Sequence, residues 1–380
     1  MNHRITIVSL IAAIAIGPIL YASHAADQPS NDRKGTGPDP ASYQRTVDKG
    51  IQFLVSGQAE DGSYGRVAPV GVTALVATAL LRNGKTVSDP TVAKALKYLA
   101  DNVRSDGSIC GERSMIPNYE TCLAISALNA ANKDGRYNDI LKKAESYVRD
   151  VQLESEDGKT QADLTYGGSG YGKKSRPDLS NTAFLIDALH DLGRGADDEA
   201  VQRAIIFVSR CQNLPSQYNS APFAAKDPDG GFYYTVDEGG ASAAGKSPDG
   251  ALRSYGTMTY AGLKSLLFAG VNKDDLRVKA AIKWLQKNYS VDENMPLGKS
   301  GLFYYYHTLA KCLDAMGDPI FVDEKGAKHD WRKEIAEELA SKQAENGSWI
   351  NQNTRWFEGD ANLVTAYSLI VLSYCRPQIQ

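Results

Sequence analysis

The chain has 380 residues, of which 42% are hydrophobic and 9% aromatic, so it can bury a large core and is not disordered as a whole. Its 42 basic and 45 acidic residues give a formal net charge of -3, and no long run of one sign occurs. A basic surface for polyanions is therefore not expected, and we predict no nucleic-acid partner.

The N-terminus has the features of an export signal. Arg4 precedes an apolar run over residues 5–22, and small residues follow at Ser23 and Ala25. This order is typical of a signal peptide, residues 1–25, that is cleaved after Ala25 and directs the protein to the periplasm or outside the cell. An uncleaved anchor is the alternative, because about 18 apolar residues can just span a bilayer. After cleavage we expect no membrane span.

The rest of the chain divides into a linker and one domain. Residues 26–40 contain Asp, Pro, Ser, Gly and Lys with almost nothing apolar, which predicts a disordered linker. Residues 41–380 are predicted to form a single domain, and we expect a monomer. Its five cysteines are widely spaced and odd in number, so we interpret them as small buried apolar residues. A disulfide between Cys110 and Cys122 is the alternative.

One unit recurs six times from residue 41 onward. Each unit has a helix-period segment, a turn rich in Gly and Asp, and a second helix-period segment that is more apolar. The first segments have one apolar stripe and a charged face, whereas the second are apolar nearly all round and must be covered on every side. The first segments are predicted at 41–57, 89–103, 139–153, 197–212, 274–288 and 329–344, and the second at about 70–83, 118–132, 178–193, 256–270, 301–316 and 360–375.

This alternation predicts an all-α fold, an (α/α)6 toroid of six helix pairs. Six covered helices then lie inside six half-covered ones, and every inner helix begins at the same end of a central cavity. Two connections, residues 154–177 and 213–255, are longer than ordinary loops and are expected to lie over the cavity mouth. The second of them is expected to contain a short hairpin.

The turns after the first segments carry a motif. Residues 343–349 have the pattern Q-x-x-x-G-x-W, and residues 58–64 repeat it with tyrosine in the last position. This pattern resembles the repeat of the squalene-hopene cyclase and protein prenyltransferase beta-subunit superfamily, and the likeness extends over nearly all of residues 41–380. The resemblance implies the toroid fold. It does not imply one activity, because that superfamily includes enzymes and non-enzymes.

The chain lacks the acid of the cyclases that it resembles. Squalene cyclases protonate an alkene with a D-x-D-D cluster, in which crowded carboxylates keep one proton unusually acidic. The acidic pairs in this chain are Asp197-Asp198, Asp227-Pro228-Asp229 and Asp274-Asp275, and none has that spacing. Cyclisation is therefore not expected, although aromatic residues that could stabilise a carbocation are present.

The chain also lacks the full zinc ligand set of the prenyltransferases. Residues 303–308 resemble the stretch that carries the zinc-binding histidine in that family, which implies His307 for this position. The resemblance also calls for an aspartate and a cysteine two residues apart, and the corresponding residues 252–256 contain neither. We therefore predict no zinc, no other metal and no cofactor.

The starts of the inner helices supply the candidate site. His307, Glu120 and Asp178 are the candidate catalytic residues, for general acid-base chemistry. A structural histidine is the alternative for His307, and a helix N-cap is the alternative for Asp178 and Asp360. Residues expected to contact a ligand are Tyr260, Tyr304, Tyr305, Tyr306, Asn181, Arg355 and Asp360.

The sequence thus predicts an exported toroid that binds a small apolar or glycan-like ligand in a central aromatic cavity, and it does not decide whether the protein is an enzyme. One alternative is a non-catalytic periplasmic scaffold, whose cavity would be filled by side chains and whose 213–255 loop would contact a partner. Another is a carbohydrate-active toroid enzyme, which would need two facing carboxylates. An open cavity favours binding or catalysis, and a filled one excludes both.

Overall fold

The computed structural model describes residues 36–154 and 157–377, which lie within one compact unit. The predicted signal peptide lies outside the described residues, as does most of the predicted linker. At the described end of that linker, the Gly37 amide donates a hydrogen bond of 2.6 Å to Asp330. Asp39 then caps the first helix by accepting from the Ser42 amide at 2.8 Å.

The described residues form twelve α-helices, one two-stranded hairpin and short 3-10 turns. All twelve α-helices begin and end within a few residues of the predicted segments. The more polar series is α1 (Pro40–Ser56), α3 (Pro90–Asp101), α5 (Asn138–Val151), α7 (Glu199–Arg210), α9 (Leu276–Asn288) and α11 (Trp331–Lys342). The apolar series is α2 (Pro69–Arg82), α4 (Pro117–Ala130), α6 (Leu179–Asp191), α8 (Gly256–Phe268), α10 (Leu302–Met316) and α12 (Ala361–Tyr374). The hairpin, β1 (Phe321–Val322) and β2 (Lys328–His329), was not predicted.

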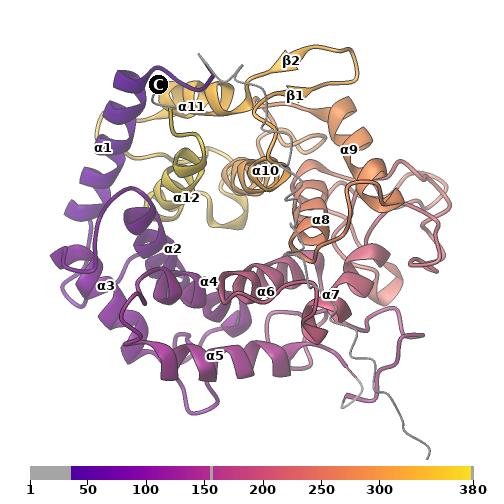
Figure 1. Cartoon of the computed structure of the whole chain (residues 1–380), viewed down its shortest axis with the longest axis horizontal. Coiled ribbons are helices and arrows are strands. Elements are labelled where there is room, and N and C mark those ends of the chain that lie inside the picture. The colour runs from indigo at the N-terminus through magenta and orange to yellow at the C-terminus, as the bar shows by residue number, and fades with distance from the viewer. Residues whose placement is uncertain (1–35, 155–156, 378–380) are drawn as a thin grey trace, which may run out of the picture. The chain divides into compact units, whose positions relative to one another are not determined.

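The apolar helices form a closed inner ring. Each packs against the next, from α2 through α4, α6, α8 and α10 to α12, and α12 packs back against α2. The other series lies outside: α3 packs on α2, α5 on α4, α7 on α6, α9 on α8, and α1 and α11 on α12. Figure 1 shows the two rings within the described unit. The prediction of an (α/α)6 toroid is confirmed.

Burial follows the two sequence patterns. In the outer helix α5, Leu141, Ala144, Tyr147, Val148 and Val151 are buried, at the three- and four-residue spacing of one face. In the inner helix α12, every residue from 363 to 372 is buried. The outer helices therefore contribute one face each to the core, and the inner helices lie entirely within it.

The glutamine motif has a structural role. The side-chain amide of Gln343 donates at 2.9 Å both to the carbonyl of Gly347 in its own turn and to the carbonyl of Thr46 in α1. Trp349 is fully buried, and its indole donates to the carbonyl of Leu339 at 2.7 Å. The motif thus ties the end of one outer helix to the start of the next, and at Gln343 it closes the ring.

Three more glutamines make the same pair of bonds. Each donates to the carbonyl of a turn glycine and to the first turn of the following outer helix. The turn glycine in the Gln343 copy, Gly347, has φ +87, and a Cβ there would lie 2.3 Å from the carbonyl oxygen of Lys49, so only glycine fits. The other three sets are Gln58 with Gly62 and Thr91, Gln152 with Gly167 and Ala200, and Gln212 with Gly230 and Arg277.

All five cysteines are buried free thiols. The interpretation of them as small buried apolar residues is confirmed.

Within residues 36–154 and 157–377, no helix has the length and apolar character that a membrane crossing requires.

Candidate functional site

A cavity of about 1170 Å³ opens at the end of the ring where the inner helices begin. Every inner helix contributes to its wall, so the centre of the toroid is hollow at this end and not filled by side chains. The contributing residues are Gly71, Val72 and Leu75 of α2, Tyr119 and Leu123 of α4, Ser180 of α6, Thr257 and Met258 of α8, Tyr304 of α10, and Asn362, Leu363 and Tyr367 of α12.

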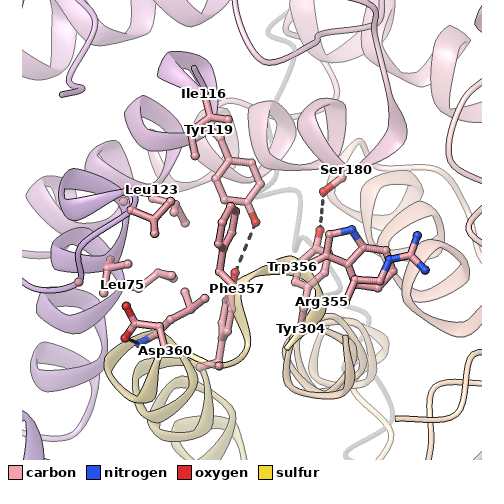
Figure 2. A pocket seen from close by; sticks show the side chains of 18 of the residues that line it. Leu75, Ile116, Tyr119, Leu123, Ser180, Tyr304, Arg355, Trp356, Phe357 and Asp360 are labelled. Atoms are coloured by element: carbon pink, nitrogen blue, oxygen red, sulfur yellow. Dashed lines mark hydrogen bonds between the residues drawn. The ribbon is translucent and has the colours of Figure 1, made fainter. Parts of the chain in front are cut away.

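The wall of the cavity is amphipathic. The part built by α2, α4 and α12 is largely aliphatic and includes Leu75, Leu123 and Leu363. The part built by α6, α8 and α10 carries hydroxyl groups, among them those of Ser180 and Tyr304. Figure 2 shows Leu75 and Leu123 on one side of the cavity, with Ser180 and Tyr304 across from them. A ligand would meet aliphatic side chains on one side, together with the hydroxyls of Tyr119 and Tyr367, and further hydroxyl groups on the other side.

Two hydroxyl pairs join inner helices that are not neighbours in the ring. Tyr119 of α4 and Tyr367 of α12 have their hydroxyl oxygens 3.4 Å apart, and those of Ser180 in α6 and Tyr304 in α10 are 2.8 Å apart. The ring of Phe184 packs against Tyr119, with centroids 4.3 Å apart. The four hydroxyl-bearing side chains form the floor of the cavity, and Phe184 supports it from behind.

Both long loops reach the cavity mouth, as expected. Residues 154–177 supply Tyr171, and residues 213–255 supply Tyr234 and Tyr255. In the second loop Thr235 and Ala241 form an isolated antiparallel bridge, which is a minimal version of the expected hairpin.

A third loop contributes to the mouth, where Arg355 was expected but Trp356 and Phe357 were not. Arg355, Trp356 and Phe357 line the cavity from a short 3-10 turn that immediately precedes α12. Trp356 and Phe357 have φ of 57° and 64°, a left-handed conformation that is costly for residues with bulky side chains. Trp356 packs against Gly301, where a Cβ would lie 2.6 Å from the indole ring. The aromatic pair Trp356-Phe357, shortly before an inner helix, was the sequence feature from which this part of the mouth could have been predicted.

Three residues predicted to contact ligand do line the cavity, namely Tyr304, Arg355 and Asp360. Arg355 lies over the ring of Trp356, with its guanidinium carbon 4.3 Å from the ring centroid. Asp360 also caps α12, because it accepts from the amide of Asn362 at 2.8 Å. Asp360 therefore both caps α12 and lines the cavity.

Three other tyrosines do not line the cavity, and the expectation for them is corrected. Tyr305 donates to the carbonyl of Ser290 and Tyr306 to that of Val291, both at 2.6 Å, so each points to the loop after α9. Tyr260 packs edge-on against Tyr305, with centroids 5.7 Å apart. Successive residues of a helix point about 100° apart, so only one of three adjacent tyrosines can face the axis.

His307 lies one helical turn below the floor and does not line the cavity. It is buried beside the rings of Phe184, Tyr304 and Tyr367, and its Nδ1 has no hydrogen-bond partner among the described residues. Burial, followed by the positive charge of Lys311, lowers the pKa of His307 to about 3. The imidazole is therefore neutral near pH 7, which fits a structural role and not the predicted acid-base role.

Glu120 is also structural. It is 1% exposed, and its carboxylate accepts from the amides of Gly71 at 3.2 Å and Gly111 at 3.3 Å. Glu358, which the sequence analysis did not select, binds the start of α10 in a similar way. It accepts from the Tyr304 amide at 2.8 Å and from the side chain of Asn351 at 2.6 Å. Burial raises the pKa of Glu358. Both carboxylates bind helix N-termini, and neither residue is among those that line the cavity.

Asp178 and Asn181 lie behind the cavity wall. Asp178 caps α6 by accepting from the Asn181 amide, and its second oxygen accepts from the Asn181 side chain, both at 2.8 Å. Burial raises the pKa of Asp178 to about 6. Neither residue is among those that line the cavity.

A buried charge cluster lies beneath His307. Asp187 of α6 contacts Lys264 of α8 at 2.5 Å and Lys311 of α10 at 2.9 Å, and the three side chains are 5%, 4% and 14% exposed. Burial alone would raise the pKa of Asp187, but the two lysines lower it to about 2. Burial lowers the pKa of Lys264 to about 8. The cluster joins α6, α8 and α10.

In the part of the chain that the structure describes, no group of three or more His, Cys, Asp or Glu side chains is arranged to hold a metal ion. Around His307 the neighbours are aromatic rings, which are not ligands for zinc. The side chains of the cavity wall can therefore hold a ligand through hydrogen bonds and apolar contacts.

The squalene-hopene cyclase C-terminal domain family matches residues 66–237. The comparison with curated proteins found no match. Among solved structures, protein geranylgeranyltransferase-I from Candida albicans, complexed with GGPP, is 12% identical, with 86% of this chain and 90% of that chain covered and a TM-score of 0.52. A novel alpha-amylase from Clostridium perfringens is also 12% identical, with 87% and 97% covered and a TM-score of 0.52.

The type II terpene cyclase MstE from Scytonema is 15% identical, with 90% of this chain and 99% of that chain covered and a TM-score of 0.36. At such low identities a structural likeness concerns the fold and not the activity. Residues 66–237 are therefore similar to the squalene-hopene cyclase C-terminal domain, and the chain has the alpha-alpha toroid fold that is also found in protein geranylgeranyltransferase-I.

Proposed function

We propose that the protein binds a terpenoid-sized apolar molecule in the cavity at the start of its inner helices. The observation that carries the proposal is the cavity itself, about 1170 Å³ in volume, with an aliphatic side and several aromatic rings in its wall. Its volume is somewhat above the roughly 300–1,000 Å³ that is usual for small-molecule sites, which are mostly apolar with a few polar groups. Apolar burial supplies the affinity, at roughly 0.8 kcal/mol for each CH₂ group.

The cavity chemistry favours binding over transformation. The one carboxylate in the described wall belongs to Asp360, which is already held as the N-cap of α12. A glycosidase needs two carboxyl groups across its site, and a squalene cyclase needs a crowded acidic cluster. His307 is neutral and lies below the floor. The likeness to an alpha-amylase is one of fold, and an apolar ligand fits this wall better than a glycan.

Titration with the hydrocarbon farnesene should give a saturable change in tryptophan fluorescence. Trp356 lines the cavity and is 42% exposed, whereas the other three tryptophans are at most 6% exposed. The Leu363→Arg variant should weaken binding at least about tenfold, because it places a charge in the apolar part of the wall. Leu363 lies in the first turn of α12 at the mouth, where the longer side chain has room.

Leu276→Arg is the matched control, because Leu276 is 57% exposed and lies outside the cavity. It should bind farnesene like the unmodified protein. If farnesene produced no saturable signal, or if both arginine variants bound it equally well, the cavity would not be the binding site.

The proposal includes export through residues 1–25 and a monomeric state. The proposal of export rests on the sequence, where small residues at Ser23 and Ala25 follow the apolar run over residues 5–22. Expression with the native N-terminus, followed by intact-mass analysis of the purified protein, should give a chain that begins at Ala26. A mass that retains residues 1–25 would favour the anchor instead.

A further inference from the structure

We propose that the ligand of the cavity is an amphipathic monoanion, an apolar chain that ends in one carboxylate, and that Arg355 at the mouth binds this carboxylate. The inference rests on the function proposed above and names the class of apolar molecule that the cavity prefers. It arises from one juxtaposition. Two guanidinium groups without a carboxylate partner lie in a wall whose other described residues, apart from Asp360, are uncharged.

The two arginines of the wall are available to an anion. Arg66 lies in the segment that leads into α2, Arg355 lies in the 3-10 turn before α12, and both are exposed. Among residues 36–154 and 157–377, neither has a carboxylate oxygen within 4.0 Å of its guanidinium nitrogens. Arg277, by contrast, contacts Asp275 at 2.8 Å. The positive charge of the two wall arginines is therefore not compensated by an ion pair within the described chain.

Asp360, the one carboxylate in the described wall, does not neutralise these arginines. One of its oxygens accepts from the amides of Asn362 at 2.8 Å and Leu363 at 3.3 Å, so the carboxylate is bound to the N-terminus of α12. The partial positive charge of that helix end compensates it. Two guanidinium groups and one carboxylate give the described wall a formal net charge of +1. This charge balances one ligand carboxylate and leaves most of the charge of a diphosphate unbalanced.

Of the two arginines, Arg355 is the one that is held in place. Its guanidinium carbon lies 4.3 Å from the centroid of the Trp356 ring, and the indole packs on Gly301, where a Cβ would lie 2.6 Å from it. Arg66 makes no comparable ring contact among the described residues. A cation–π contact requires no N–H donor, so the donors of Arg355 remain for a carboxylate, which arginine binds with two parallel hydrogen bonds.

The position of Arg355 suits the head group of an amphiphile. Figure 2 shows Arg355 on the same side of the cavity as Ser180 and Tyr304, across from Leu75 and Leu123. A ligand whose carbon chain lies against the two leucines can therefore place its polar end at the arginine. Because Arg355 is exposed, a carboxylate bound there keeps part of its hydration and avoids the full cost of burying a charge.

The test compares farnesoic acid, which is ionised at pH 7, with its primary amide, which has nearly the same shape and no charge. Isothermal titration calorimetry measures both affinities, because Arg355 lies over the tryptophan ring that would report them by fluorescence. At low salt the unmodified protein should bind the acid about 3- to 10-fold more tightly than the amide, as expected for one ion pair at a partly hydrated position. Salt at about 0.5 M should reduce this preference, because it screens the charge.

Three variants assign the preference to one side chain. Arg355→Gln should bind the acid and the amide with nearly equal affinity, whereas Arg355→Lys keeps the charge and should retain much of the preference. Arg113→Gln is the matched control and should keep the full preference. Arg113 is exposed in the loop before α4, at the same end of the ring, and is not among the residues that line the cavity.

The inference is overturned if the unmodified protein binds the amide as tightly as the acid, or if Arg355→Gln keeps the preference. Tighter binding of farnesyl diphosphate than of farnesoic acid would also overturn it, since the site would then take more than one negative charge. In each of these cases farnesene can still bind, and the proposed function then stands without the carboxylate. If farnesene does not bind, the proposed function fails first, so the two failures are distinguishable.

Discussion

Lowering the pH from about 6.5 towards 3 should remove roughly 3–5 kcal/mol of stability through His307 alone. The folded protein holds the pKa of this histidine near 3, against a usual value of 6.5, because the imidazole is buried and Lys311 lies one turn further along α10. Between these values the unfolded chain takes up a proton that the folded protein does not. The stabilisation is therefore complete above pH 6.5 and is lost as the pH falls through that window.

The measurement is urea unfolding of the unmodified protein and of His307→Phe between pH 7 and 4. The charged groups around His307 are Lys311, Asp187, Lys264 and Arg82, and all of them remain in the variant. The free energy of unfolding should fall less steeply with acid in the variant. His329→Phe, in the surface hairpin, serves as the control and should keep the steep slope. Equal slopes for His307→Phe and the unmodified protein would contradict the assignment.

Replacing Asp187 by asparagine should lower the free energy of unfolding by roughly 3–5 kcal/mol. Lys264 and Lys311 both contact this carboxylate in a setting where the lysine side chains are 4% and 14% exposed. Without it, two buried ammonium groups face each other with no counter-charge. Chemical denaturation of the variant at pH 7 measures the effect.

Two further variants distinguish the loss of a charge partner from a general loss of packing. The triple replacement Asp187→Leu, Lys264→Met and Lys311→Met removes all three charges and should recover much of the stability. Asp314→Asn removes one partner of a pair with Arg332 in which Asp314 is 45% exposed, and it should cost about 1 kcal/mol or less. A mild effect of Asp187→Asn would show that the cluster is solvated.

The architecture could be predicted from the sequence because it depends on local patterns. The contrast between amphipathic and uniformly apolar segments located all twelve helices and assigned each to the inner or outer ring. The Gln343 motif identified the turns, and the structure adds the physical reason, a side chain that joins consecutive outer helices. Gln152 and Gln212 have the same role without the full motif, so sequence spacing alone missed them.

The site was only partly predictable, because it depends on helix phase and on contacts between distant segments. Three adjacent tyrosines start α10, and only the docking of that helix decides that Tyr304 faces the cavity. The low pKa of His307 depends on burial and on charges contributed by four helices, α2, α6, α8 and α10. Trp356 and Phe357 reach the mouth through a left-handed turn. Glycine is the residue that favours such a turn, and because the sequence has no glycine at these positions, the turn was not predicted.

The most direct test of the central claim is a crystal structure of the protein soaked with farnesol. The account predicts electron density for one molecule inside the cavity, with its carbon chain against Leu75 and Leu123. A cavity that holds only water, with farnesol absent or bound on the outer surface, would contradict the proposed function.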